Sequence, residues 1–366
     1  MNMDGPLAGI RIVEMDAIGP VPLAAMLLAD MGCDIVRVAR PPGAGVWNDV
    51  GGTVLHRNRR HVHLDLKARD DCDRALDLIA QADALIEGFR PGVMERLGLG
   101  PEIALARNPR LVYARMTGWG QTGPLAPRAG HDINYLSITG ALRAMGTPDA
   151  PPPVPLNLVG DYGGGAMFAV TGILAALLHV RAGGAGQAID VAMTDGVSAL
   201  STFFHAYRAT GRWSDARGAN LLDGSAPFYR CYTCADGEFV AVGALEPQFF
   251  ALLLDGLGLP SARFVQHDRA GWPEMTAAFA AAFGAYPRDH WATVFAGVDA
   301  CVTPVLAFGE AAAHPQNRTR ATLVAPEGVV QPAPAPRFAK TPMTINPARR
   351  GETEVAEVLR GWNTAA

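Results

Sequence analysis

The first forty residues contain a strand, a helix and a second strand, and this pattern constrains the fold more than any other feature. Residues 10–15 alternate as a strand does, residues 23–31 carry apolar side chains at helical spacing, and residues 33–38 form a second strand. Gly32 is placed to end the helix. Because two strands joined by a helix pair in parallel, the sequence predicts an α/β protein built on a parallel sheet.

The alternation of strands and helices continues through an expected large domain, residues 1–195. We expect a linker at residues 196–225, a smaller α/β domain at 226–322, and a proline-rich return segment with a last helix at 323–366. The fold class is therefore α/β, with a large Rossmann-like open parallel-sheet domain and a smaller α/β domain. Further strands are expected at residues 64–67, 84–87, 111–114 and 188–192, and helices at 71–81, 166–180, 197–210 and 352–362.

Composition narrows the classes of function. The chain has 366 residues and a net charge of -4, which gives no indication of a nucleic-acid partner. Its five cysteines are scattered, which favours a reducing cytoplasm over a disulfide framework. The N-terminal residues lack the basic region and apolar core of a secretion signal. The apolar residues 166–180 are fewer than the ~20 needed to cross a bilayer, so we expect a cytoplasmic protein with no membrane span.

Two short motifs have the residue spacing of a cofactor site and of a metal site, but the neighbouring sequence completes neither site. Residues 118–123 fit G-x-G-x-x-G, but Pro124 and Pro127 leave no helix to receive a pyrophosphate. The first βα turn also lacks a glycine-rich fingerprint, so no nicotinamide cofactor is expected. Cys231 and Cys234 have the spacing of zinc ligands, but no second pair completes a site. We therefore expect these two cysteines to pack in a hairpin.

The residues with the clearest chemical potential are His131 and Asp161. His131 follows Gly130, and Asp161 precedes the glycines at 163–165. Inverting a stereocentre beside a carbonyl requires one group to remove a proton and another to return it on the opposite face. Imidazole and a partly buried carboxyl group can both exchange protons near neutral pH. A structural histidine and a helix N-cap aspartate are the alternative interpretations of these two residues.

The carbon acid is the harder part of such a reaction. A thioester α-proton is roughly ten or more pK units less acidic than imidazolium, a gap of at least ~14 kcal/mol at ~1.4 kcal/mol per unit. Donors aimed at the forming enolate oxygen must supply part of this energy. We expect Gly163, Gly164 and Gly165 to open the helix at 166–180 and to present backbone N–H groups there, with Asp161 just before the helix.

A basic run lies between the second strand and the helix at 71–81. It consists of Arg40, the segment 56–61 with three arginines and two histidines, and His63 to Lys67. It can be a solvated face, or a pocket in which guanidinium groups bind phosphate oxygens. The residues alone leave both interpretations open.

Several long motifs in the same order resemble the α-methylacyl-CoA racemases of the family III CoA-transferase superfamily, the CaiB/BaiF type. The motifs are residues 115–124, 130–135, 160–165, 217–224, 243–249 and 299–306. The resemblance covers nearly the whole chain. It implies a C-terminal segment that returns to the large domain and an interlocked homodimer.

The resemblance also assigns roles to particular residues. It implies catalysis by His131 and Asp161, with Glu246 of the other subunit orienting the histidine. It favours the phosphate pocket for the basic run. The positions implied to bind coenzyme A or substrate are Arg40, Leu64, Asp65, Leu66, Lys67, Gly88, Phe89, Arg90, Arg96, Gly130, Asp132, Ile133, Asn134, Tyr135 and Asn157. The chain departs from the family in the segment Pro20 to Pro22, which lacks a middle glycine, and at His56 and His61.

The implied activity is an isomerase of lipid and fatty acid metabolism. It would interconvert (2R)- and (2S)-2-methylacyl-CoA thioesters through an enolate, without a metal or organic cofactor and with coenzyme A as part of the substrate. A second hypothesis is CoA transfer between carboxylates, in which Asp161 is a nucleophile that forms a mixed anhydride. A third is an acyl-CoA-binding protein without catalysis.

Overall fold

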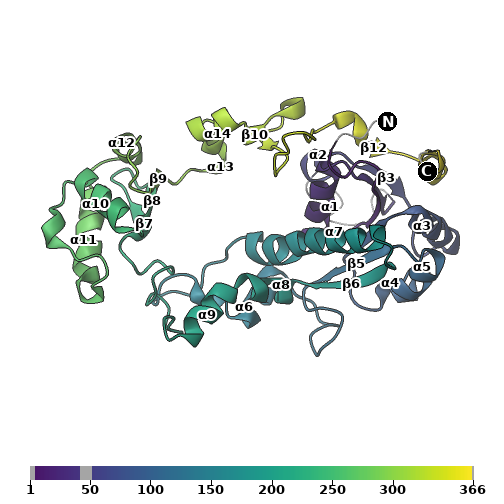
Figure 1. The fold of residues 1–366 in the computed structure, drawn as a ribbon, viewed down its shortest axis with the longest axis horizontal. Helices are drawn as coiled ribbons and strands as arrows, with labels where there is room; N and C mark the ends of the chain where they lie inside the picture. Colours follow the sequence, from purple (N-terminus) through teal and green to yellow (C-terminus); the bar gives the residue numbers. More distant parts are fainter. Residues whose placement is uncertain (1–4, 42–51, 365–366) are drawn as a thin grey trace. The chain divides into compact units, whose positions relative to one another are not determined.

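The computed structural model describes residues 5–41 and 52–364 (Figure 1). The chain forms two compact units. The first comprises Met1–Ala141, Pro155–Thr202 and Arg318–Ala366, and the second comprises Leu142–Val154 and Phe203–Asn317. Residues 142–154, which the sequence analysis assigned to the large domain, thus group with the second unit.

The first unit is built on a parallel sheet of seven strands in the order β12-β3-β2-β1-β4-β5-β6. The expected strand, helix and strand at its start are β1 (Arg11–Met15), α1 (Pro20–Asp30) and β2 (Asp34–Ala39), and β1 pairs in parallel with β2. The predicted α/β class with a parallel sheet is confirmed. The other strands are β3 (Arg60–His63), β4 (Ala84–Glu87), β5 (Val112–Thr117), β6 (Gln187–Ala192) and β12 (Gly351–Glu352).

The strand predicted at residues 64–67 is wrong, because β3 covers Arg60–His63 and so lies four residues earlier in the sequence. The N–H of Leu64 still bonds the carbonyl of Ala39, and the Leu64 side chain is buried in the core. The carboxylate of Asp65 then accepts the N–H of Lys67, and this turn ends the extended backbone before α3. The side chain of Leu64 is therefore part of the core, and its contact with coenzyme A stays a prediction.

Helices cover both faces of this sheet (Figure 1). Apolar side chains of α1 and α7 (Met167–Arg181) share one core with the sheet. Those of α3 (Arg69–Gln81), α5 (Pro101–Arg107) and α15 (Val355–Asn363) share the other. Strand β12 pairs with β3, and α15 packs against α3, so the C-terminal segment does return to the sheet as predicted.

A long apolar helical segment runs from Leu158 to Arg181. It begins as the π-helical η2 (Leu158–Ala166) and continues as α7, so it starts well before residue 166, where the sequence analysis placed its beginning. Within the described residues it is the one helix long and apolar enough to cross a membrane by length and composition. Half of its most apolar stretch is buried in the protein, where Ala169, Val170 and Ile173 contribute to the sheet core.

The centre of the basic run is buried and bound to carboxylates, which rules out a solvated face for residues 57–59. Arg57 Nη2 lies 2.6 Å from Asp30 Oδ2, and Asn58 donates to the other oxygen of Asp30 at 2.9 Å. Arg59 pairs with the buried Glu14 at 2.5 Å. Desolvation of a charge is costly, and each buried guanidinium therefore takes a buried carboxylate as its partner.

The same residues hold the return segment. Arg57 Nη1 donates to the carbonyl of Pro332 at 2.7 Å and to Gln331 at 3.0 Å. Asn58 donates to the carbonyl of Thr344 at 2.9 Å and accepts the N–H of Asn346 at 2.7 Å. Side chains of the basic run thus fix the C-terminal segment to the sheet.

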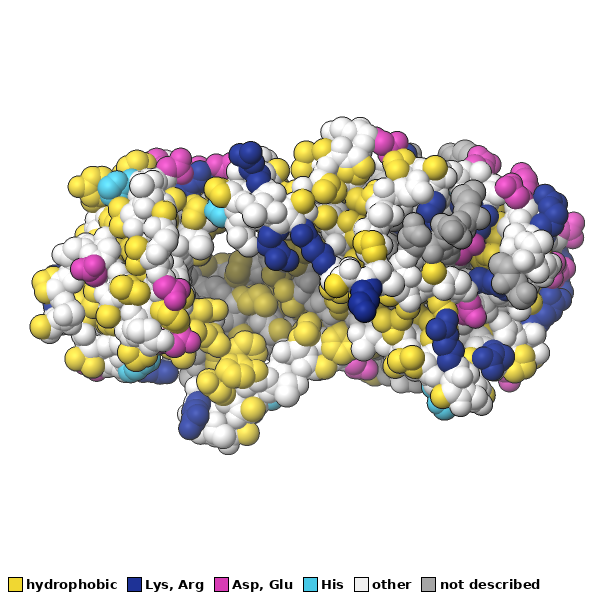
Figure 2. Space-filling view, turned by 45° about the horizontal axis from the view of Figure 1, so that its top comes forward, with side chains coloured by type: hydrophobic (Ala, Val, Ile, Leu, Met, Phe, Trp, Pro, Cys, Tyr) yellow, Lys and Arg dark blue, Asp and Glu magenta, His cyan; other side chains and the backbone are white. Residues whose placement is uncertain are grey.

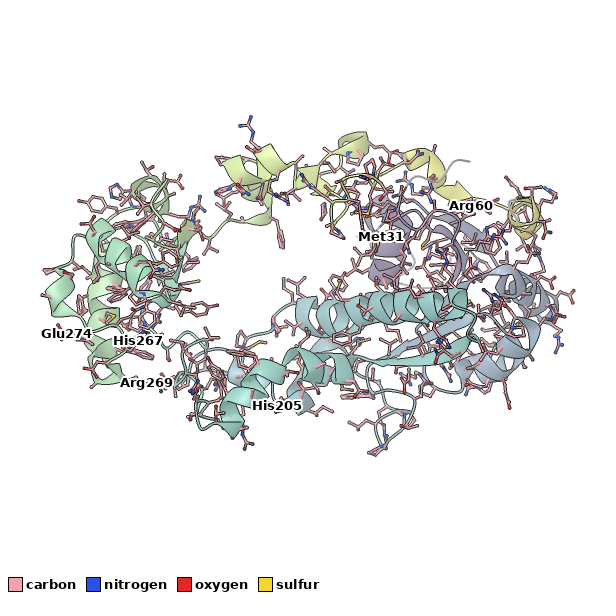
Figure 3. All side chains as sticks on the ribbon, in the orientation of Figure 1. Met31, Arg60, His205, His267, Arg269 and Glu274 are labelled. Carbon is pink, nitrogen blue, oxygen red and sulfur yellow. The ribbon has the colours of Figure 1, made fainter. Side chains whose placement is uncertain are left out.

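The second unit has a sheet of three antiparallel strands, β7 (Tyr229–Thr233), β8 (Phe239–Gly243) and β9 (Val302–Pro304). Helices α10 (Pro247–Gly256), α11 (Trp272–Phe283) and α12 (Arg288–Val294) share an aromatic-rich core with it. Near α11, Arg269 lies 5.3 Å from the centre of the Trp272 ring, as a cation–π contact (Figure 3). Cys231 and Cys234 lie on the β7–β8 hairpin as free thiols. Cys234 is buried there as predicted, whereas Cys231 is exposed.

The single helix predicted over residues 197–210 is in fact two helices. They are α8 (Met193–Leu200) and α9 (Thr202–Ala209), with Ser201 between them. The remaining elements are α2 (Gly52–Leu55), α4 (Val93–Arg96), α6 (Asp132–Thr139), α13 (Phe308–Ala311), α14 (Pro315–Arg320), β10 (Leu323–Val324), β11 (Gln331–Pro332) and the short 3₁₀ helices η1 (Leu142–Ala144), η3 (Ser261–Arg263), η4 (Arg269–Gly271), η5 (Pro326–Gly328) and η6 (Pro347–Arg349).

The substitution Arg57→Met tests the buried network. It leaves the carboxylate of Asp30, 1% exposed, without its cation, and we expect a loss of about 3–5 kcal/mol in the free energy of unfolding. The control is Arg107→Met, which breaks the exposed pair with Asp77 and should cost less than about 1 kcal/mol. Denaturant titration measures both, and equal midpoints for the two variants would contradict the role given to Arg57.

Candidate functional site

A cavity of about 570 Å³ opens in the first unit where three strands of the parallel sheet end. Segments that follow β1, β4 and β5 line it, at residues 16–22, 88–91 and 117–119. The carboxyl ends of parallel strands are the usual location of binding sites in open α/β sheets. The loop after β5 and His131 both line the cavity.

The cavity brings the two proposed proton-transfer groups together. His131, Asp161 and Asn157 all line it. The charge of His131 is near enough to lower the pKa of Asp161, although burial, the largest effect, and then the charge of Asp132 outweigh it. The pKa of Asp161 is thereby raised to about 6. This carboxyl group can therefore gain or lose a proton close to neutral pH.

The segment that carries Asp161 differs from the predicted helix start. Asp161 and the three glycines lie inside the π-helical η2, not before a helix N-terminus, so the prediction that these glycines present free N–H groups at a helix start is wrong. π-Helical segments are rare and frequently occur at functional sites. Here the segment places the Asp161 carboxyl group at the cavity wall.

The glycines allow close packing of η2. A Cβ atom on Gly196 of α8 would lie 2.0 Å from the carbonyl oxygen of Gly164, and one on Gly164 would lie 2.8 Å from the side chain of Val197. At Gly165 a Cβ atom would make a less severe but still tight contact, 3.1 Å from Pro20 at the start of α1. Glycines at these positions are therefore needed so that η2 can pack directly on α8 and α1.

His131 is held by its backbone at the start of α6. Its N–H donates to Asn134 Oδ1 at 3.1 Å, and its carbonyl accepts the N–H of Asn134 at 2.8 Å. The next residue, Asp132, is buried and accepts the N–H of Asp161 at 2.7 Å. One short segment thus positions both His131 and the backbone of Asp161. Asn134 and Asp132 hold the site together, and they are absent from the residues that line the cavity.

Two aromatic rings form the wall beside His131. Trp119 and Tyr135 meet edge to face, with ring centres 4.8 Å apart. The Tyr135 hydroxyl donates to the carbonyl of Gly130. A Cβ atom on Gly118 would overlap the Tyr135 ring at 1.9 Å, and one on Gly130 would approach both rings. The glycine-rich motif at 118–123 therefore allows ring packing, and no helix follows it, as the sequence analysis expected.

The predicted binding residues other than Arg40 divide into two groups. Those that line the cavity are Gly88, Phe89, Arg90, Gly130, Tyr135 and Asn157. Those that do not are Leu64, Asp65, Leu66, Lys67, Arg96, Asp132, Ile133 and Asn134. The first four of that second group form the turn after β3, and Arg96 is exposed on α4.

A second hollow of about 460 Å³ adjoins the first and shares Asp16, Arg37 and His56 with it. Arg40 lines this hollow and is exposed. Arg37 and Arg350, which belong to none of the sequence motifs, also line it. Because Arg37 lies within β2 and Arg350 directly before β12, only the pairing of β2, β3 and β12 brings them to one place.

The second hollow carries less positive charge than its residue types suggest. Arg37 pairs with Asp16, Arg59 with Glu14, Arg60 with Asp34 and Arg350 with Glu327. Burial, followed by the charges of Arg37 and Arg59, lowers the pKa of His56 to about 3, so this imidazole is neutral. Basic and acidic side chains are also interspersed over the face in Figure 2.

Glu246 lies in the second unit, where it is exposed at the start of α10. Its carbonyl accepts the N–H of Phe250, which begins the helix. The role that the resemblance implies for this carboxylate stays a prediction.

Comparison with known proteins agrees with the sequence motifs. Residues 7–352 match the model of CoA-transferase family III. The chain is 45% identical over 361 residues to α-methylacyl-CoA racemase of Mus musculus, which covers 97% of this chain and 93% of that protein. It is 34% identical over 348 residues to acetyl-CoA:oxalate CoA-transferase of Acetobacter aceti, with 90% and 88% covered.

Its structure is similar to a CAIB/BAIF family protein from Brucella suis, with a TM-score of 0.79 and 26% sequence identity over 93% of this chain and 95% of that one. The predicted resemblance to the family is confirmed. This chain belongs to CoA-transferase family III.

Proposed function

We propose that this protein is an α-methylacyl-CoA racemase, an isomerase that interconverts (2R)- and (2S)-2-methylacyl-CoA thioesters. The observation that carries the proposal is that the imidazole of His131 and the carboxyl group of Asp161 line one cavity. The similarity to the mouse racemase over nearly the full length of both chains supports the same activity.

In this mechanism one of the two groups removes the α-proton and the other returns a proton to the opposite face of the enolate. The proton count balances, because the group that accepted a proton becomes the acid for the reverse reaction. Asp161 suits both roles, since its pKa of about 6 lies close to neutral pH. The reaction as proposed uses no metal or organic cofactor.

The two adjoining hollows suit an elongated substrate. They share Asp16, Arg37 and His56, so one ligand can extend from the cavity of His131 and Asp161 into the hollow lined by Arg40. We place the acyl group in the first and the phosphates of coenzyme A in the second. Arg40 is exposed there, and no ion pair to it is found among the described residues, so its charge is available to a phosphate.

CoA transfer is the alternative reaction. It is supported by the 34% identity to the acetyl-CoA:oxalate CoA-transferase of Acetobacter aceti. In a transferase Asp161 attacks the thioester and forms a mixed anhydride, and the histidine has no evident task. Hydroxylamine added during turnover separates the two reactions, because it modifies Asp161 only if the anhydride forms. A non-catalytic acyl-CoA-binding protein would bind the thioester, without proton exchange, equally well after His131→Ala.

We also propose a homodimer in which Glu246 of one subunit orients His131 of the other. The exposed position of Glu246 at the start of α10 leaves its carboxylate available to a second chain. We place the protein in the cytoplasm, in lipid metabolism, and the five free thiols support a reducing compartment.

The first prediction concerns proton exchange in deuterated water. The wild type should incorporate deuterium at the α-carbon of both epimers while it interconverts them. His131→Ala and Asp161→Asn should each slow inversion by about 10²–10⁴-fold, because each variant lacks one proton-transfer group. Each variant should still exchange the α-proton of one epimer with retention of configuration. The epimer that exchanges should differ between the two variants, because each keeps a different proton-transfer group.

NMR of the product and chiral analysis of the thioester measure these rates. Asp77→Asn, on the exposed surface of α3, is the matched control and should behave as the wild type. Absence of exchange in the wild type with any branched acyl-CoA would overturn the proposed function.

The second prediction concerns pH. Because the folded-state pKa of Asp161 lies above the value of a free aspartate, the carboxylate that acts as base is lost as the pH falls through about 6. Proton exchange from the epimer that Asp161 deprotonates should fall in the same range. Asp132→Asn removes a negative charge that raises this pKa, so the acid limb should move to lower pH.

The pH profile of single-turnover exchange measures this shift, with Asp77→Asn again as the control. A shift to higher pH in Asp132→Asn would contradict the electrostatic coupling between the two carboxyl groups.

The third prediction tests the shared site. Coexpressed His131→Ala and Glu246→Ala chains should be active, although each variant alone is impaired. In a dimer with one chain of each variant, one site lacks both His131 and Glu246, and the other site has both. Half of the dimers are mixed when the chains associate at random, so roughly a quarter of all sites are complete. Activity of the mixture no higher than the mean of the single variants would place Glu246 outside the partner's site.

A further inference from the structure

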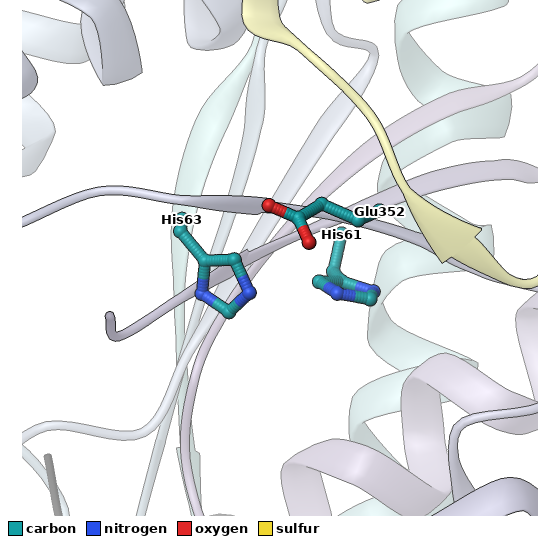
Figure 4. Close-up of side chains that lie close together, drawn as sticks. All are labelled: His61, His63 and Glu352. Carbon is teal, nitrogen blue, oxygen red and sulfur yellow. The ribbon is translucent and has the colours of Figure 1, made fainter. Parts of the chain in front are cut away.

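Three side chains that can bind a metal lie together on the edge of the large sheet (Figure 4). His61 and His63 are separated by one residue on β3, so they project from the same face of the strand. Glu352 of β12 pairs in register with His61, and this places its carboxylate beside the imidazoles. One ligand atom from each residue lies within 4.8 Å of the other two.

A hydrogen bond orients one of these rings. His63 Nδ1 lies 2.7 Å from the carbonyl oxygen of Arg40, and it donates to this acceptor when the proton is on Nδ1. In that tautomer the lone pair of Nε2 is free. Histidines that bind metals commonly donate their second ring nitrogen to a backbone carbonyl in this way. His61 and His63 are further fixed by edge-to-face contact, with ring centres 5.1 Å apart.

The arginines around these three side chains repel a bound cation less strongly than their number suggests. Of those that line the same hollow, Arg37, Arg59, Arg60 and Arg350 each form an ion pair with a carboxylate, and Arg40, for which no ion pair is found among the described residues, is exposed to solvent. Glu352 adds a further negative charge at the edge, where it is exposed. The local balance of charge therefore permits a divalent ion.

We propose that His61, His63 and Glu352 form a binding site for a divalent transition metal of the Zn²⁺ type. Two imidazoles and one carboxylate suit Zn²⁺ or Co²⁺ better than Mg²⁺ or Ca²⁺, which prefer oxygen ligands alone. In a tetrahedral site the ligand atoms lie about 3.3 Å apart, so the three side chains need to close by about 1.5 Å or less. Three protein ligands leave a fourth position for water.

This site is separate from the proposed proton-transfer chemistry. His61 and His63 line the second hollow and are absent from the cavity that contains His131 and Asp161. The inference does not depend on the proposed function, because its ligands and its tests involve neither His131 nor Asp161. A bound ion would lie in the hollow where we place the phosphates of coenzyme A, and it would take no part in the α-proton exchange.

Titration calorimetry with Zn²⁺ on the full chain tests the site, after removal of any polyhistidine tag and of bound metal by a chelator. We expect one ion per chain, and a visible ligand-field band when Co²⁺ replaces Zn²⁺. The double variant His61→Ala/His63→Ala should lose both signals. Glu352→Gln should bind at least about tenfold more weakly, since even the loss of an outer partner of a ligand costs about 10–100-fold.

His205→Ala is the matched control, because His205 is an exposed histidine on α9 in the second unit (Figure 3). It should bind Zn²⁺ as the wild type does. Zn²⁺ should also raise the unfolding temperature of the wild type and of the control but not that of the double variant. Equal Zn²⁺ binding by the wild type and the double variant, or none by the wild type, would overturn the proposal. If the double variant fails to fold, Glu352→Gln serves as the test, because the Glu352 side chain is exposed and its replacement should leave the fold intact. Unchanged Zn²⁺ binding by Glu352→Gln would count against the site.

Discussion

The site depends on the direct backbone contact between η2 and α8. Gly164 and Gly196 approach so closely that no side chain can stand between them. This contact fixes the π-helical segment, and the segment presents Asp161 to the cavity. The N–H of Asp161 is held in addition by Asp132, which follows His131 directly. The two groups that must act on one carbon are therefore coupled through a single set of short contacts.

The same contacts determine the acidity of Asp161. Burial is the largest cause of its raised pKa, and the neighbouring charge of Asp132 adds to it. The residue that secures the backbone of Asp161 thus also keeps its carboxyl group ready to carry a proton. The contact between α6 and η2 therefore contributes both to the position of Asp161 and, together with burial, to its raised pKa.

Much of the fold followed from local pattern, and the misses have physical causes. The initial strand, helix and strand were predictable because each has a clear period and Gly32 ends the helix. The turn at Asp65 was missed because a leucine on each side of it continues the apolar alternation of a strand. The helical start at Leu158 was missed because three glycines normally disfavour a helix, and only tertiary packing against α8 makes them suitable.

The candidate site residues differ in how far the sequence alone could predict their positions. His131, Asp161 and Asn157 were named from motifs and do line one cavity. The basic run was harder to interpret, because composition does not reveal which arginines have partners. Arg57 and Arg59 are neutralised by Asp30 and Glu14, which are far away in the sequence, so sequence alone could not separate them from an exposed cation such as Arg40.

The placement of β12 at the edge of the sheet has a consequence for biosynthesis. The outer edge of β3 stays unpaired until residues 351–352 have left the ribosome, although β3 itself is made almost three hundred residues earlier. During this interval the nascent chain exposes an open strand edge, the kind of surface that invites association with other chains. Over the same interval Arg57 and Asn58 can bind Asp30, but they lack their partners in the return segment, which are Gln331, Pro332 and Thr344.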